Sequence, residues 1–163
     1  MKDDDLLREI IESEKAKWFA LHPRNQMITL EQYVGIHKDS PDWTLERQYN
    51  AVKLLSVCAD LQALMIEGSV EFPDNPNTKC GIAGTTMGGF RPQSATAGAP
   101  KSAHKEGLAV DRYDPSGAID TWLMNNPAIL ESFGIYIEHP VCTKGWSHWS
   151  IQSPPSGHHV FYP

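Results

Sequence analysis

The chain has 163 residues, 40% of them hydrophobic and 21% charged, which is enough for one domain with a substantial core. This composition excludes a disordered chain and a collagen-like repeat. Fourteen Lys and Arg against twenty Asp and Glu give a net charge of −6. Because no basic stripe is present to neutralise phosphates, nucleic acid is not an expected partner.

Neither a secretory nor a membrane protein is expected from the pattern. The N-terminus is acidic where a signal peptide would be basic and apolar. The longest apolar stretch, residues 54–66, is interrupted by Asp60 and is too short for a membrane span. The three cysteines are far apart and form no CxxC pair, which excludes a zinc ribbon. They are either thiols of a reducing compartment or one disulfide with one free thiol. We therefore expect a soluble chain made in a cytoplasm.

Residues 4–19 are predicted to form an amphipathic helix, because apolar side chains recur there at helical spacing. These side chains are Leu7, Ile10, Ile11 and Trp18. We interpret residues 1–24 as a helical extension that packs on a main domain of residues 25–163.

A second, longer helix is the clearest predicted element. Ser40-Pro41-Asp42 is a typical start signal, with a capping hydroxyl followed by a first-turn proline and an acid. Gly68 is the predicted stop. A broad apolar face between these signals makes this the core helix of the domain.

The second half is predicted to be of the α+β class. Residues 73–103 are rich in Gly, Pro, Ser and Thr and should form loops around short strands. Beyond them we expect strands at 108–111, 135–137 and 146–151. A helix at 119–133, with an interruption at Pro127, completes the pattern.

Two histidines lie in surroundings that favour metal binding. His104 and Asp111 are seven residues apart, and Gly107 permits a bend that would let them converge. In the last strand, Trp146 and His148 share one face, so Trp146 is a candidate wall of a cleft. Two imidazoles and one carboxylate with a fourth position open form a catalytic zinc arrangement. On spacing alone, a hydrogen-bonded structural His–Asp pair is the alternative.

A longer motif links these residues. It is Ser102-x-His104-x-x-Gly107-x-Ala109-x-Asp111, preceded by Gly89-Phe90-Arg91-Pro92 and followed by Trp146-x-His148. In order and spacing this pattern resembles the M15 family of zinc D-Ala-D-Ala peptidases, which includes bacterial D,D-carboxypeptidases and many bacteriophage endolysins. The resemblance covers about residues 28–163. It implies a small antiparallel sheet with flanking helices, as in the Hedgehog and D,D-peptidase folds.

The resemblance also assigns roles. His104, Asp111 and His148 would bind Zn²⁺, which lowers the pKa of a bound water toward 7 and polarises a peptide carbonyl. Arg91 matches the family arginine that holds substrate and the developing negative charge. Ser102 matches a serine that hydrogen-bonds within the site.

One family position differs. Most M15 enzymes place a general-base glutamate three residues before the last histidine, where this chain has Gly145. If residues 135–139 and 146–151 pair as a hairpin, either Glu138 or His139 faces His148, and a one-residue change of register exchanges them. We favour Glu138, because a carboxylate beside zinc-bound water repeats the family chemistry; His139 is also a workable base at neutral pH.

The expected function is that of a phage lysin-like zinc metallopeptidase. It would hydrolyse peptide bonds of bacterial peptidoglycan, as a D,D- or L,D-carboxypeptidase or endopeptidase. We expect a monomer that is located in the host cytoplasm before lysis or is associated with the virion, with no nucleic-acid or membrane partner. The alternative is a catalytically weak or inactive zinc-binding protein, either a phage structural protein or a cell-wall-binding protein, because the usual base position is Gly145.

Overall fold

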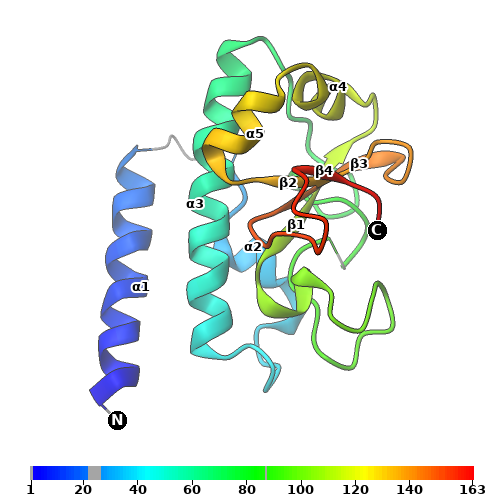
Figure 1. Cartoon of the computed structure of the whole chain (residues 1–163). Coiled ribbons are helices and arrows are strands. Elements are labelled where there is room, and N and C mark those ends of the chain that lie inside the picture. The colour runs from blue at the N-terminus through cyan, green and yellow to red at the C-terminus, as the bar shows by residue number, and fades with distance from the viewer. Residues whose placement is uncertain (1, 22–26, 87) are drawn as a thin grey trace.

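The first half of the described chain is mainly helical, whereas the second half holds the strands together with two shorter helices (Figure 1). The structure is a computed structural model that describes residues 2–21, 27–86 and 88–163. Its helices are α1 (Lys2–Leu21), α2 (Leu30–Val34), α3 (Leu45–Glu67), α4 (Ala118–Asn125) and α5 (Pro127–Phe133), with 3₁₀ turns η1 (Gly35–His37) and η2 (Ala103–Glu106). Its strands are β1 (Ala109–Asp114), β2 (Tyr136–Glu138), β3 (Gly145–Ser150) and β4 (Val160–Phe161).

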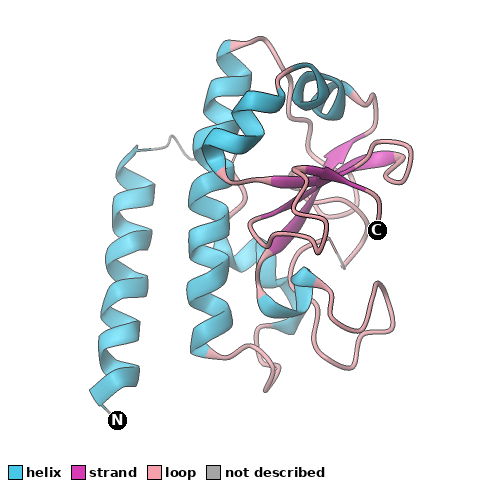
Figure 2. Cartoon of the chain, viewed as in Figure 1, coloured by secondary structure: helices cyan, strands magenta, loops and turns pink. Residues whose placement is uncertain are grey.

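The strands gather in one sheet (Figure 2), in which their order is β1-β3-β2-β4. The three predicted strands pair antiparallel, as expected. The fourth strand, β4, was not predicted; it pairs parallel with β2, so the sheet is mixed rather than purely antiparallel. The α+β class is confirmed.

The core lies between α3 and one face of this sheet. Leu54, Leu61 and Met65 of α3 are fully buried in one cluster with Val110 of β1 and Trp149 of β3. Because side chains alternate between the two faces of a strand, the neighbours of these core residues point to the opposite face. The candidate site occupies that second face.

The start of α3 differs from the prediction. The helix begins at Leu45, and the cap is Thr44, whose hydroxyl accepts a hydrogen bond from the Arg47 N–H. The Ser40 hydroxyl instead accepts from the Asp42 N–H, so the Ser-Pro-Asp sequence forms a turn before the helix. The predicted stop at Gly68 is confirmed as the C-cap.

Two other segments refine the sequence interpretation. The predicted helix 119–133 is divided at Pro127 into α4 and α5, as the proline suggested. In residues 73–103 the expected short strands are reduced to two isolated bridges, Asn75 with Cys80 and Ile82 with Arg112. A run so rich in Gly and Pro cannot sustain a longer ladder.

The N-terminal helix α1 packs against α3 (Figure 1), and Ile11 of α1 is buried. Leu6 and Ile10 remain exposed on it, and the side chain of Trp18 lies outside the described residues. Within the described ranges, no helix has both the length and the apolar character needed to cross a bilayer.

Candidate metal centre

A row of chemically active side chains runs across the second face of the sheet. Asp111 on β1 lies directly opposite His148 on β3. The register of β2 with β3 pairs Tyr136 with Ser150 and Ile137 with Trp149, so the next position along β2 is opposite His148. That position is Glu138. Directly opposite residues point to the same face, so the sheet aligns Asp111, His148 and Glu138.

The first histidine reaches this row from η2, which precedes β1. Gly107 ends η2 in the left-handed conformation, with a φ of 74°, and turns the chain into the strand. A Cβ at Gly107 would lie 2.5 Å from the carbonyl oxygen of Arg47 on α3, so the position also lacks space for a side chain. The predicted bend between His104 and Asp111 is therefore confirmed at this glycine.

His104, Asp111 and His148 converge on one point. The Asp111 Oδ1 lies 2.8 Å from His148 Nδ1 and 3.2 Å from His104 Nε2. All three residues are buried, and their ligand atoms lie within 4.8 Å of one another, so the group could hold a metal ion. Burial alone would raise the pKa of the Asp111 carboxyl, but the charges and hydrogen bonds of the two imidazoles hold it well below its usual range.

Further polar contacts orient these groups. The His104 Nδ1–H donates to the Gly89 carbonyl at 2.8 Å, which fixes the ring with its Nε2 directed toward Asp111. The second carboxylate oxygen of Asp111 accepts a hydrogen bond from Arg91 Nη2 at 2.8 Å. Such outer partners fix the tautomer and orientation of metal ligands. Arg91 thus contacts a candidate ligand directly.

The two glycines before Arg91 are explained by close backbone contacts. Gly88 accepts a hydrogen bond from the Asp111 N–H at 2.7 Å. A Cβ at Gly88 would lie 2.3 Å from the Ala83 carbonyl, and one at Gly89 would lie 2.0 Å from the Tyr33 carbonyl. Only glycine fits where the backbone passes this close to Ala83 and Tyr33. The close approach brings the Gly88 carbonyl to Asp111 and the Gly89 carbonyl to His104.

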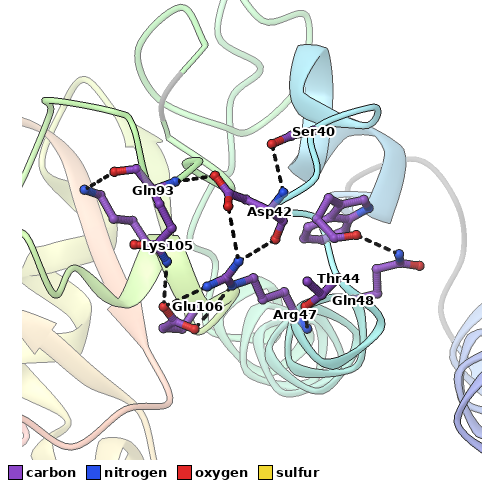
Figure 3. A network of polar contacts seen from close by, with 9 residues as sticks. Ser40, Asp42, Thr44, Arg47, Gln48, Gln93, Lys105 and Glu106 are labelled. Carbon is purple, nitrogen blue, oxygen red and sulfur yellow. Dashed lines mark hydrogen bonds and ion pairs between the residues drawn. The ribbon is translucent and has the colours of Figure 1, made fainter. Parts of the chain in front are cut away.

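A polar network ties the loops of the site to α3 (Figure 3). Arg47 on α3 donates from Nε and Nη2 to the Glu106 carboxylate at 3.3 and 3.2 Å, and from Nη1 to the Asp42 carbonyl at 2.7 Å. Gln93 donates its backbone N–H to Asp42 and its side-chain amide to Glu106. Lys105 donates to the Gln93 carbonyl. The network joins the segment just after the cavity arginine to the 3₁₀ turn that carries the first histidine.

The three candidate ligands line a cavity of about 510 Å³, a size typical of small-molecule sites. The predicted site residues Arg91, Ser102, Trp146 and Glu138 all line it. His139 is not among the lining residues: it stacks on Tyr162, with ring centroids 4.7 Å apart, and its Nδ1 accepts from the Val141 N–H. Of the two alternative bases, the structure places Glu138 in the cavity.

Gly145, at the family position of the base, is exposed at the start of β3 with a φ of 91°. Nothing lies within 4 Å of a Cβ built there. No other described group therefore fills the position. Glu138, on the neighbouring strand, is the carboxylate that lines the cavity in addition to Asp111.

Several cavity residues were missed in the sequence, among them Gly98 and Phe161. Gly98 lies in the loop before η2 with a φ of 79°, and a Cβ there would be 2.7 Å from Arg91 Nη1. Phe161 on β4 also lines the cavity. Its signal was the β-branched and aromatic run Val160-Phe161-Tyr162 after a glycine turn, which is typical of a short strand.

Comparisons with models of protein families, with curated proteins and with solved structures gave no match for this chain.

Proposed function

We propose that the protein is a zinc metallopeptidase that hydrolyses peptide bonds of bacterial peptidoglycan. The observation that carries this proposal is the convergence of two histidines and one aspartate, all buried, with Glu138 beside them in the same cavity. The donor set of two imidazoles and one carboxylate is the type that catalytic zinc sites use. The Asp111 Oδ1 lies 2.8 Å from His148 Nδ1 and 3.2 Å from His104 Nε2, and one ion with bonds of about 2.0–2.2 Å can span both separations.

Zinc held by His104, Asp111 and His148 would supply an acidic water and polarise the scissile carbonyl. The residues of the chain supply the rest of the chemistry. Glu138 accepts the proton of the attacking water and passes it to the leaving amine. Arg91 holds the Asp111 carboxylate in place and presents a positive charge at the cavity wall, where a substrate oxygen can bind.

The substrate assignment rests on the sequence motif. The M15-like pattern from residues 89 to 151 favours a peptide of the bacterial cell wall, with D,D- or L,D-carboxypeptidase or endopeptidase action. The proposed setting is a phage lysin-like protein, acting from the host cytoplasm at lysis or from the virion. Trp146 and Ser102, which line the cavity together with the candidate ligands, are the proposed substrate contacts.

The central test uses muropeptides and a matched pair of variants. We expect the zinc-loaded protein to hydrolyse the peptide, to stop when a chelator is added and to recover with Zn²⁺. The variant E138Q should retain about one equivalent of zinc and lose about 10²–10⁴-fold in kcat, the usual effect of removing a general base. The control H139Q changes the neighbouring residue outside the cavity and should keep kcat within a few-fold.

Two results would contradict this proposal. Equal loss in both variants would mean that Glu138 is not the base. A folded, zinc-loaded protein that hydrolyses no D,D- or L,D-linked peptide would favour the alternative function, a zinc-binding protein of the phage structure or the cell wall. Elemental analysis of H148A tests the ligand set separately, because this variant should lose the bound zinc whichever function holds.

A further inference from the structure

The C-terminal strand β4 is held against the edge of the site by backbone hydrogen bonds. Ile137 N–H of β2 donates to the His159 carbonyl at 2.8 Å, and His139 N–H donates to the Phe161 carbonyl at 2.7 Å. These bonds belong to the parallel pairing of β2 with β4, in which Glu138 lies opposite Phe161. Phe161 therefore continues the row of site residues that runs across the sheet.

Two stacked His–Tyr pairs hold the same strand on either side of Phe161. His159 stacks on Tyr136, with ring centroids 4.4 Å apart and an interplanar angle of 4°, and its Nδ1–H donates to the Ile135 carbonyl at 2.7 Å. Tyr162 stacks on His139 beyond the other end. His159 is half-buried in this contact. These two ring stacks restrict the position of β4 and therefore of Phe161, which lies between His159 and Tyr162.

The two candidate histidine ligands are oriented by different means. His104 is fixed by its hydrogen bond to a backbone carbonyl. The Nδ1 of His148 faces Asp111, whereas its other ring nitrogen has no hydrogen-bond partner among the residues that the structure describes. The orientation of this ring therefore depends on its contact with Asp111 and on packing. The Phe161 ring meets it edge to face, with centroids 6.3 Å apart and an interplanar angle of 85°.

We propose that Phe161 is a positioning residue that holds the His148 imidazole in its metal-binding orientation and shields it and Glu138 from bulk water. The inference depends on the metal site of the proposed function but not on the substrate. The ring takes the place of the hydrogen bond that usually orients a metal-bound histidine. Because β4 carries this ring, the C-terminal strand is a working part of the site.

The test is a cobalt titration of the chelator-treated protein, since Co²⁺ bound by nitrogen and oxygen ligands has a visible spectrum. We expect F161A to bind Co²⁺ about tenfold more weakly than the parent chain, with an altered absorption band. F161Y keeps the ring and should restore both properties, whereas F161L keeps only apolar volume and should restore affinity incompletely.

The control is V160A. Val160 lies on the same strand but packs on the core on the other side of the sheet, so its loss weakens β4 without opening the cavity. V160A should lower the melting temperature yet leave cobalt affinity and spectrum unchanged. Parental cobalt binding by F161A, or an equal loss in V160A, would overturn the positioning role. If the parent chain itself binds no cobalt, the metal site and the proposed function fail together.

Discussion

Two buried aspartates on opposite faces of the sheet show how the surroundings set a carboxyl group's charge. The pKa of Asp111 is held low because the imidazoles of His104 and His148 outweigh its burial. Burial raises the pKa of Asp120, at the start of α4, to about 6; the hydroxyls of Ser147 and Thr143 oppose this rise incompletely. The folded structure thus favours the charged form of the Asp111 carboxyl and the protonated form of the Asp120 carboxyl.

The Asp120 carboxyl should make stability depend on pH. Its ordinary pKa is 3.8, so between about pH 4 and pH 6 the folded chain holds a proton that the unfolded chain has released. The free energy of unfolding therefore falls as pH rises through this window. We expect D120N, which is neutral throughout, to raise the free energy of unfolding at pH 7 by about 1–2 kcal/mol. Water in the adjoining cavity, which Asp120 lines, screens part of the full effect.

Urea denaturation at pH 4.5 and pH 7 measures this effect. The gain in D120N should be much smaller at pH 4.5, where the parent carboxyl is already protonated. The control is D39N, which removes an exposed carboxylate and should change little at either pH. If D120N and the parent lose the same stability between the two pH values, the buried carboxyl is not the source of the dependence.

At the scale of elements, the sequence predicted best where local signals agree with packing. The long helix, the division at Pro127 and the bend at Gly107 carry strong local signals, and the structure contains all three. The start of α3 was misplaced because Ser40 and Thr44 are both good caps, and tertiary contacts select between them. The short α2 was missed, although Thr29 and Gln32 form a capping box.

The choice of base shows where sequence reasoning on the site ends. The side chains of Glu138 and His139 point to opposite faces of β2, and the face that points into the cavity depends on strand register. Register is a property of the assembled sheet and of the turn that closes it. The pairing of Ile137 with Trp149, two fully buried residues, settles it through core packing. The alternation of Ile135 and Ile137, both fully buried, is the signal within the strand, because it sends these two side chains to the core and Glu138 to the opposite face.

The Arg47 network is expected to stabilise the loops around the site. Its guanidinium makes a two-point contact with Glu106 and is largely shielded from solvent, a geometry stronger than an ordinary surface pair. We expect R47M to lower the free energy of unfolding by about 1–2 kcal/mol. R47K should recover less than half of this loss, because an ammonium cannot make the forked contact.

Equilibrium unfolding in urea, with K53M as the control, measures this contribution. Lys53 is an exposed residue of the same helix whose ammonium lies over the Tyr49 ring and makes no part of the network. The same charge is removed in both variants, so net charge does not distinguish them. If R47M and K53M have the same free energy of unfolding, the Arg47 network does not stabilise the loops around the site.

For the whole molecule, the metal site joins parts of the chain that are distant in sequence. The candidate ligands come from η2, β1 and β3, and the core between α3 and the sheet holds these elements together from the opposite face. An unfolded chain does not keep residues 104, 111 and 148 together, so an ion should bind the folded state selectively. Metal binding and folding are then thermodynamically linked.

This linkage predicts a zinc-dependent melting temperature. At a free Zn²⁺ concentration about 100 times the Kd, selective binding adds ~2.7 kcal/mol, which raises the melting temperature of a chain of this size by roughly 5–10 °C. Calorimetry of chelator-treated protein with and without Zn²⁺ should show this rise, and H148A should abolish it. H158A removes an exposed histidine outside the ligand group and should retain the full rise. An equal rise in H148A would place the stabilising zinc elsewhere on the surface, because the three-residue site could not then be its ligand set.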